Sequence, residues 1–385
     1  MKVDYLIKNG KTLNVDTMAF EPRDIAVDNG VIVPCEAGLE AAHVIDAKGK
    51  YVLPGLVDEH MHLNYGGSNI SVNPDLACIP MGITTALDAG SCGWINFDSF
   101  CNNVIPKCSP SVYAYVNVSP LGVQCRLHPE ENMNTEDFDE REILNCFRKH
   151  PDVVKGIKVR LTTATLGDYD IEPLRRGMEI AKYIEDNGYK CLVAVHYDNL
   201  PPQVTVQEIL DLLRPGDIFT HYLQVHKETV FDEAGHVRDI VRGAQARGVL
   251  MDTGNSGMHW SIKHIKQSLE DGFYPDIISS DVGRYTLYKR PSFSLIYHMC
   301  VLSACGLDEK EIIKRVTYNP AKALGILDKA GTLEIGRPAD ICVMDIRDSD
   351  DTLEDLYGGT VKANKMFVPL LTMKAGYIHF RQIFF

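Results

Sequence analysis

The chain has 385 residues, of which 45% are hydrophobic and 24% are charged, an ordinary composition for a folded protein. Its length is enough for one barrel domain and a smaller second domain. Its formal net charge of −13 disfavours nucleic acid and anionic membranes as partners, since both need a basic patch, and favours a small-molecule substrate. The N-terminus lacks the apolar run of a signal peptide, and the 11 cysteines include no CxxC pair. We therefore expect a soluble, cytoplasmic protein with reduced thiols and no membrane-spanning segment.

Both ends of the chain alternate short strand-like runs with turn residues. The apolar runs at 5–7 and 25–27 are each followed by an Asn-Gly pair, which is a strong turn signal. The segments GTLEIGRPADICVMDI and FVPLLTMKAGYIHF repeat this pattern near the C-terminus. We therefore predict a small β-sandwich built from residues 1–53 and 329–385, on either side of a barrel at residues 54–328.

The middle of the chain repeats an apolar strand followed by a charged, helical segment. Eight strand candidates begin roughly 30 residues apart, which is the length of one βα unit. They are Leu56–His62, Gly82–Asp88, Val112–Ser119, Val154–Arg160, Lys190–His196, Asp217–Tyr222, Gly248–Thr253 and Asp276–Asp281. Eight such units predict an α/β fold with a closed (β/α)8 TIM barrel, although the repeat alone also fits an open, doubly wound sheet.

Metal-capable side chains end several of these strands. His60 and His62 lie two residues apart in GLVDEHMHL, so both imidazoles project from one face of a strand and can reach one ion. His196, His221 and Asp281 end, or nearly end, three other strands. The C-terminal ends of the strands form the rim at which TIM-barrel enzymes assemble their sites. We therefore predict that these five residues share one metal centre.

A lysine on the fourth predicted strand is a candidate bridge between two ions. Four histidines and an aspartate could hold one ion with a spare ligand, or two ions joined by an anionic group. In VKGIKVRL, Lys155 and Lys158 have opposite parity and cannot face the same way. Lys158 shares a face with Arg160 and lies nearer the C-terminal end of the strand, where the rim is, so it is the candidate. Reaction of the Lys158 amine with CO2 would give a carbamate, whose two oxygens can join both ions. A surface lysine is the alternative interpretation.

These six residues, in this order, resemble the ligand set of the amidohydrolase superfamily, and the likeness covers nearly the whole chain. Flanking segments agree, among them VLPGLVDEHMHL, VTYNPAKALGI and GTLEIGRPADICVMD. Finer segments such as GIKVR, THYLQ and SSDVGRYTL are similar to a branch related to dihydroorotases and D-aminoacylases. Members of that branch are deacetylase-like or cleave acylated amino or hydroxy acids. One departure follows the seventh strand, where GNSGMH replaces the His-Gly pair that is common in the branch.

The resemblance implies two divalent metal ions, with zinc as the first candidate and manganese, iron or cobalt as alternatives. It also implies N6-carboxylysine at Lys158, formed with CO2, as the bridge between them. By the same resemblance, His60, His62 and Asp281 would bind the more buried metal ion, and His196 and His221 the more exposed one.

The mechanism that this resemblance implies is hydrolysis of an amide or ester bond by a hydroxide that bridges the metals. Asp281 would be the catalytic proton shuttle, taking the proton of the nucleophile and returning it to the leaving group. The substrate would be an N-acyl amino acid or an acyl hydroxy acid. A cyclic-amide hydrolase of the dihydroorotase or hydantoinase kind is the nearest alternative, and a catalytically inactive scaffold of the same fold is the alternative outside the enzymes.

Residues near the same rim are candidates for substrate binding. Arg160 shares the parity of Lys158 and could clamp a substrate carboxylate, with a structural ion pair as the alternative. Four further candidates follow predicted strands one, seven and eight: Tyr65, His259, Arg284 and Tyr285. The apolar C-terminal tripeptide 383–385 is consistent with a covered patch in a homo-oligomer.

Overall fold

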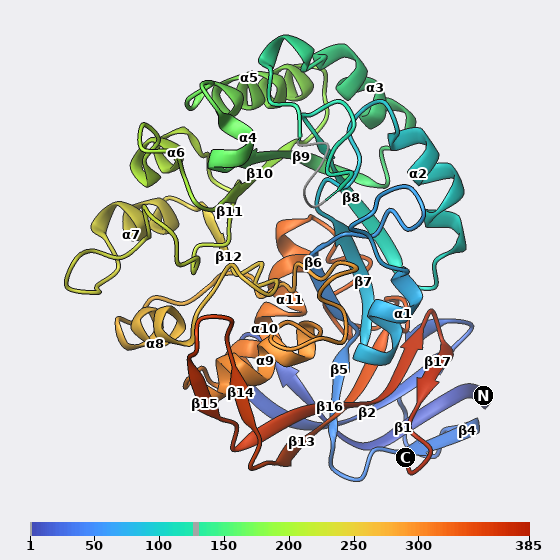
Figure 1. The fold of residues 1–385 in the computed structure, drawn as a ribbon. Coiled ribbons are helices and arrows are strands. Elements are labelled where there is room, and N and C mark those ends of the chain that lie inside the picture. The colour runs from blue at the N-terminus through green and yellow to red at the C-terminus, as the bar shows by residue number, and fades with distance from the viewer. Residues whose placement is uncertain (1, 126–130) are drawn as a thin grey trace.

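A parallel sheet curls through the centre of the molecule, in a computed structural model that describes residues 2–125 and 131–385 (Figure 1). Its seven strands follow the order β12-β11-β10-β9-β8-β7-β6. Their bounds are β6 Leu56–Met61, β7 Ile83–Asp88, β8 Ser111–Asn117, β9 Val154–Leu161, β10 Leu192–Tyr197, β11 Ile218–Thr220 and β12 Leu250–Asp252. Each strand overlaps one of the first seven predicted strands. The sequential order excludes a doubly wound sheet, in which the order reverses at a switch point.

The eighth predicted strand closes the circle through single bridges and is not a continuous strand. Ile277 forms a parallel bridge to β12, and Val282 forms one to β6. Between these bridges, the backbone N–H groups of Ser279 and Ser280 donate to side chains, Thr253 Oγ1 and Asp58 Oδ1 respectively. These side chains take the place of a neighbouring strand. The predicted barrel is therefore confirmed, with its eighth position built irregularly.

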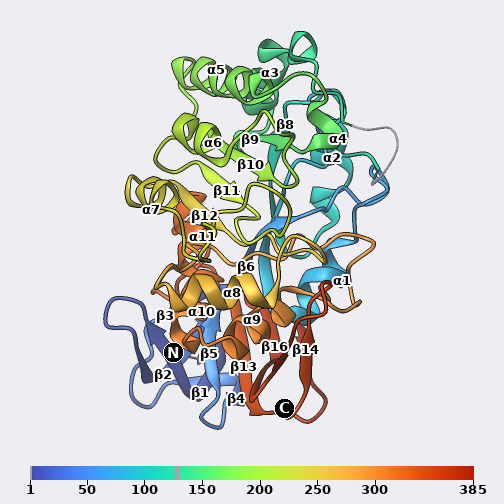
Figure 2. The ribbon, with the colours of Figure 1, turned by 60° about the vertical axis from the view of Figure 1, so that its left-hand side comes forward.

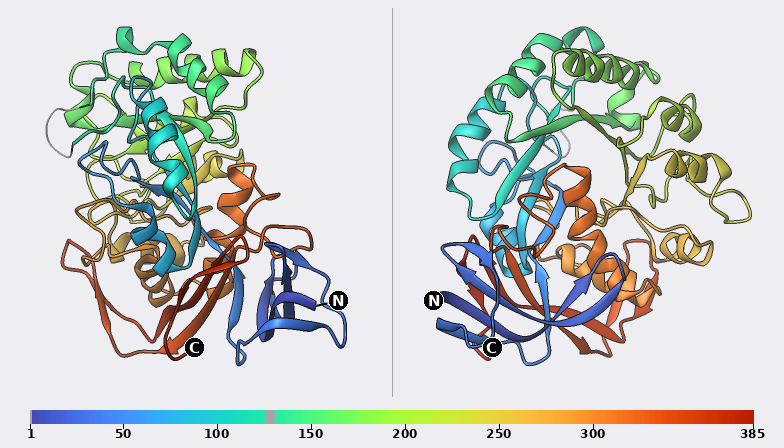
Figure 3. Two further views of the ribbon diagram at one scale, coloured as in Figure 1. Left: turned by 90° about the vertical axis from the view of Figure 1, so that its right-hand side faces the viewer. Right: turned by 180° about the vertical axis from the view of Figure 1, so that it is seen from behind.

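Helices cover the outside of the barrel (Figures 1 and 3). They are α2 Phe97–Asn103, α3 Glu140–Lys149, α5 Glu172–Asp186, α6 Val206–Leu212, α7 Asp239–Ala246, α8 Ile262–Glu270, α9 Leu295–Ala304 and α10 Glu309–Arg315, with the short α1 Pro74–Cys78 and α4 Thr163–Leu166 in the loops. The helix α11 Tyr318–Ala323 instead lies within the ring of strands, where Ala321 shares a buried cluster with the strand residues Val57 and Tyr115 (Figures 1 and 3). The helix α5 is amphipathic, and Leu174, Ile180 and Ile184 are among the residues on its buried face. None of the helices in the described part of the chain is long and apolar enough to cross a membrane.

Strands from both chain ends form one hydrogen-bonded sheet, which lies below the barrel (Figure 2). Its order is β17-β16-β13-β5-β1-β2-β3, with β4 paired to β1. The bounds are β1 Lys2–Asn14, β2 Ala19–Asp28, β3 Val31–Val33, β4 Glu40–Asp46, β5 Tyr51–Pro54, β13 Ile341–Asp348, β16 Lys365–Lys374 and β17 Tyr377–Arg381. The strand β5 joins the two ends, because it pairs with β1 on one side and β13 on the other. Ile7, Val52 and Ile341 lie in the buried cluster of this domain. Its predicted assembly from both termini is confirmed.

A small hairpin, β14 Thr352–Glu354 and β15 Thr360–Lys362, is inserted between β13 and β16. It leaves the sheet domain and lies against the barrel near α8 and α9 (Figure 1). At the C-terminus, Ile383 and Phe384 are exposed in the single chain, and their place in an oligomer stays a prediction.

Candidate metal centre

The predicted ligands converge at the carboxyl ends of the barrel strands. A cavity of about 350 Å³ opens there, and its lining includes five of the six: His60, His62, Lys158, His196 and Asp281. The sixth, His221, is fully buried beside them, with its Nε2 atom 2.8 Å from Nδ1 of His196. The cavity lies in the size range of small-molecule sites.

His60 of β6 and His62, directly after this strand, face one carboxylate oxygen. The Nε2 atoms of His60 and His62 lie 3.5 Å and 3.3 Å from Asp281 Oδ1. Their opposite ring nitrogens face protein groups: His62 Nδ1 lies 2.9 Å from the hydroxyl of Ser91, and His60 Nδ1 lies 3.5 Å from a carboxylate oxygen of Asp252. Histidines that bind metals are commonly oriented in this way by a second partner.

A second group consists of His196, His221 and His259, whose ligand atoms lie within 4.8 Å of one another. His221 Nδ1 lies 2.6 Å from the backbone oxygen of Gly254, which can only accept, so this nitrogen carries the proton. The lone pair of His221 therefore lies on Nε2, the atom that faces His196. His221 also belongs to the other group, with His60 and Asp281, and links the two.

The donor set fits divalent metal ions. Burial, followed by the charges of neighbouring cationic groups, lowers the pKa of His196 and of His221 well below the usual value, which favours the neutral, ligating form of imidazole. Burial raises the pKa of Asp281, but His60 and His62 outweigh it and hold that pKa below its usual value. Within the described residues, His196 Nε2 and Lys158 Nζ are buried without a hydrogen-bond partner. Buried polar atoms are seldom left in this state, and a bound ion is one explanation.

The backbone is unusual at two of the predicted ligands. His221 has a φ of 69° and Asp281 a φ of 46°, in the left-handed region that residues with a side chain rarely adopt. Such conformations cost about 1–3 kcal/mol and are concentrated at functional sites. Gly254 packs against the His221 ring, and a Cβ there would lie 2.6 Å from His221 Nδ1. Only glycine therefore fits at the position that fixes this ring.

Lys158 projects from β9 into the cavity, as its parity predicted, and Lys155 does not line it. Lys155 instead lies over the ring of Tyr113, 4.7 Å from its centroid. Burial is the largest influence on Lys158 and lowers the pKa of its ammonium group. Gly90, with a φ of 87°, packs against the lysine stem, since a Cβ there would lie 2.8 Å from Lys158 Cβ.

The candidates for substrate binding divide into two sets. Arg160, His259 and Tyr285 line the cavity. Tyr65 and Arg284 are exposed and are not among its lining residues. Both follow strand ends in the sequence, but a loop changes direction after the strand, so strand parity no longer fixes where its side chains lie.

Arg160 forms the ion pair that was the alternative to a substrate clamp. Its Nη1 donates to Glu131 Oε2 at 2.8 Å, and Asn117 Nδ2 donates to the other oxygen of Glu131 at 2.7 Å. Glu131 is missing from the sequence-based candidates because no strand or motif marks its loop. By contrast, Asp252 ends β12, and the strand-end rule that found the histidines could have found it.

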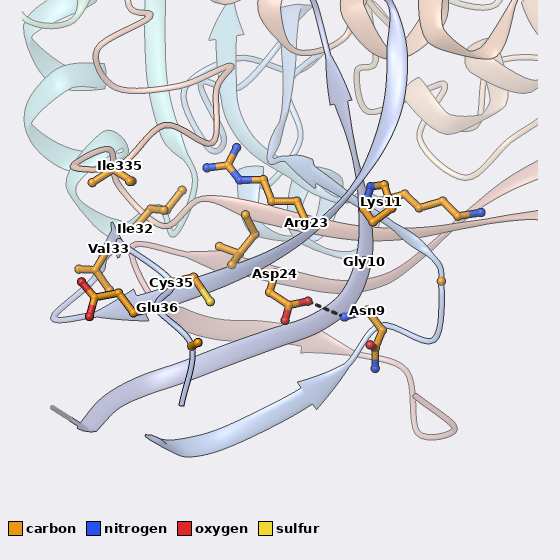
Figure 4. A pocket seen from close by; sticks show the side chains of 14 residues that line it. Asn9, Gly10, Lys11, Arg23, Asp24, Ile32, Val33, Cys35, Glu36 and Ile335 are labelled. Atoms are coloured by element: carbon orange, nitrogen blue, oxygen red, sulfur yellow. Dashed lines mark hydrogen bonds between the residues drawn. The ribbon is translucent and has the colours of Figure 1, made fainter. Parts of the chain in front are cut away.

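A larger cavity, of about 660 Å³, lies in the sheet domain (Figure 4). Its lining includes Asn9, Arg23, Asp24 and Cys35 from the N-terminal strands and loops. Asp24 accepts a hydrogen bond from the backbone N–H of Asn9 and is engaged within the domain. Neither group of metal-capable residues found in the described chain includes a residue of this cavity, so the barrel cavity is the candidate site.

Comparisons with known proteins agree with this site. Residues 189–378 and 43–89 match models described as "Amidohydrolase family". A deacetylase of Brucella anthropi is 30% identical over 84% of this chain and 79% of its own length, and a deacetylase of Enterococcus faecalis is 30% identical over 98% and 100%. An adenine deaminase structure has a TM-score of 0.89 at 28% identity, covering 98% of this chain and 99% of its own, and a dihydroorotase structure has 0.87 at 25%, covering 98% of both. The resemblance is confirmed, and the chain belongs to the amidohydrolase superfamily.

Proposed function

We propose that this protein is a binuclear metal-dependent hydrolase of the deacetylase kind, acting on an N-acyl amino acid or an acyl hydroxy acid. The observation that carries the proposal is the convergence of four histidines, one aspartate and one lysine at a single barrel cavity, where the lysine amine has no hydrogen-bond partner among the described residues. Deacetylases that are 30% identical to this chain favour acyl transfer to water over other reactions of the superfamily.

The proposed ligands form two sets around a shared bridge. His60, His62 and Asp281 would hold one ion, and His196 and His221 the other. When bound, two such ions lower the pKa of a water molecule towards neutrality and polarise a carbonyl group.

Lys158 is the proposed bridge, as N6-carboxylysine. A neutral amine attacks CO2 through its nitrogen lone pair, the new N–C bond forms, and one proton leaves to solvent. Burial favours this neutral amine, and no other described group forms a hydrogen bond with Nζ. The resulting carbamate would give the site an anion where the free lysine would place a cation.

Asp281 is the proposed proton carrier. Its Oδ1 atom faces His60 and His62, whereas Oδ2 lies 3.9 Å from Nε2 of His259. Because Asp281 lines the cavity, its carboxylate can take a proton from the attacking water and deliver it to the leaving nitrogen or oxygen. This transfer lets an amine leave as a neutral molecule.

The dihydroorotase likeness makes cyclic-amide hydrolysis the second candidate, with the same ligands and a different substrate. A panel of N-acetyl amino acids, acyl hydroxy acids, dihydroorotate, hydantoins and adenine separates the candidates when it is assayed with metal-loaded protein. We expect hydrolysis of acylated amino or hydroxy acids. Turnover of the cyclic amides or of adenine alone would contradict the proposal.

A further inference from the structure

The β14–β15 hairpin brings a residue of the C-terminal segment to the mouth of the barrel cavity. Leu356, in its turn, lines the cavity, although 57% of its surface is exposed. Figure 1 shows this hairpin, in dark red, against the barrel beside α8. An apolar side chain that is left open at the mouth of a site can contact a ligand.

Asp355 fixes the position of this turn. Its Oδ1 accepts the backbone N–H groups of Tyr357 and Gly359, each at 2.8 Å, and closes the turn. Its Oδ2 accepts the N–H of Ile262 at the start of α8, also at 2.8 Å. One buried carboxylate therefore shapes the hairpin and attaches it to the barrel.

Further contacts hold both sides of the hairpin. Tyr357 Oη donates to the backbone oxygen of Met258 at 2.6 Å, in the loop after β12. Tyr297 Oη, from α9, donates to the backbone oxygen of Glu354 at 2.9 Å, and the N–H of Glu354 donates back to that hydroxyl at 3.1 Å. The hairpin that carries Leu356 is therefore held in place against the barrel by these hydrogen bonds.

The same cavity is lined by apolar side chains and by an available cation. Met258, Pro291, Ile70 and Val123 line it together with Leu356. Lys289 also lines it, and no ion pair of Lys289 occurs among the described residues, whereas Arg160 is paired with Glu131. An α-amino or α-hydroxy acid with an apolar side chain carries a carboxylate and an apolar group on one carbon. That combination matches a cavity lined by Lys289 and by apolar side chains.

We infer that Leu356 and Met258 form a specificity lip, which selects substrates whose leaving group is an amino or hydroxy acid with a medium-sized apolar side chain. The inference rests on the proposed function and names the substrate class within it. Lys289 would face the carboxylate of the leaving group. The hairpin would thus contribute to selectivity without taking part in bond cleavage.

The test compares kcat/KM for N-acetylleucine with kcat/KM for N-acetylglycine. For the wild type we expect the ratio of kcat/KM for N-acetylleucine to kcat/KM for N-acetylglycine to be above about 10. The reason is that one extra methylene in an apolar pocket raises kcat/KM about 10-fold or more. Leu356→Ala should lower this ratio by about tenfold, and Leu356→Met, which conserves volume, should retain it. Asp355→Ala should also lower the ratio, because it releases the turn.

The matched control is Leu76→Ala on α1, where a leucine of similar exposure, 61%, lies outside the cavity lining. This variant should keep the wild-type ratio. Melting temperatures close to that of the wild type establish that each variant is folded. A wild-type ratio near one, or an unchanged ratio in Leu356→Ala, would overturn the inference and leave the proposed function standing. Failure of the wild type to hydrolyse any acylated amino or hydroxy acid would overturn both.

Discussion

Three of the proposed ligand histidines use one ring nitrogen for the centre and the other for a protein group. Ser91, the Gly254 carbonyl and Asp252 are the partners of His62, His221 and His60 respectively. Such partners set the tautomer and the ring orientation, and a carboxylate partner also makes the ligating nitrogen more basic. The affinity of the centre should therefore depend on residues that do not contact the metal.

Asp252→Asn tests this dependence, because it removes the negative charge near His60 and keeps the shape of the side chain. We expect metal affinity to fall about 10–100-fold, measured by competition with a chelator. Asp345→Asn, in the sheet domain, is the matched control and should bind metal like the wild type. Equal affinities for the two variants would refute a role of Asp252 in orienting His60.

Lys158→Ala should lower turnover by several orders of magnitude without unfolding the protein, because it removes the proposed carbamate bridge. Lys158→Arg keeps a cation but cannot form this carbamate, and should be equally impaired. Turnover, metal content and melting temperature are the measurements. Near-normal turnover of metal-replete Lys158→Arg would exclude a carboxylated lysine.

The loops at the strand ends position the proposed ligands because their backbones pack closely against the ligand side chains. The loop after β7 places Gly90 against the stem of Lys158, and the loop after β12 places Gly254 against His221. Both glycines have positive φ values, 87° and 46°, so these loops combine a left-handed backbone with tight packing.

Gly90→Ala should lower both stability and metal occupancy, because its new Cβ would lie 2.8 Å from Lys158 Cβ. Gly188→Ala is the matched control: its φ of 90° is almost the same, but no atom lies within 4 Å of the added Cβ. Each variant should lose about 1 kcal/mol from backbone strain alone. Only Gly90→Ala should also lose metal in elemental analysis, and equal metal content in the two would contradict this packing argument.

The C-terminal end of α8 is attached to α7 and the loop before it by Asp271. Hydrogen bonds from His236 and from the N–H of Val237 lower the pKa of Asp271 to about 2, from an ordinary value of 3.8. A carboxyl group whose pKa is depressed by folding stabilises the fold above pH 3.8, and this contribution is lost as the pH falls towards 2.

Asp271→Asn should therefore lower the free energy of unfolding at pH 7, and its difference from the wild type should shrink as the pH falls below about 4. Urea unfolding at pH 7 and at pH 3 measures both values. The exposed Asp211 on α6 provides the control substitution Asp211→Asn, which should have little effect at either pH. If Asp271→Asn and the wild type differed in free energy of unfolding by the same amount at pH 7 and at pH 3, the charge of Asp271 would not be involved.

Across the whole molecule, regular elements were predictable from the sequence and irregular contacts were not. The alternation of apolar strands and charged helices indicated the barrel, and strand parity separated Lys158 from Lys155. The irregularity of the eighth strand was not predictable, because the side chains of Thr253 and Asp58 accept its backbone hydrogen bonds and no periodicity reveals this. Contacts between segments that are distant in the sequence, such as that of Leu356 with the barrel cavity, depend on how the hairpin folds back. The sequence around Leu356 contains no pattern that predicts this contact.

The barrel supplies the proposed ligands, and the sheet domain adds one side of the cavity mouth through its hairpin. The proposed ligands thus come from the barrel alone, whereas the proposed specificity lip combines Met258 of a barrel loop with Leu356 of the hairpin. Elemental analysis of the purified, metal-loaded protein tests the central claim most directly. We predict about two divalent ions per chain, with both removed by a chelator together with hydrolytic activity. A protein that binds no metal, or that hydrolyses acylated amino acids equally well without it, would contradict the account.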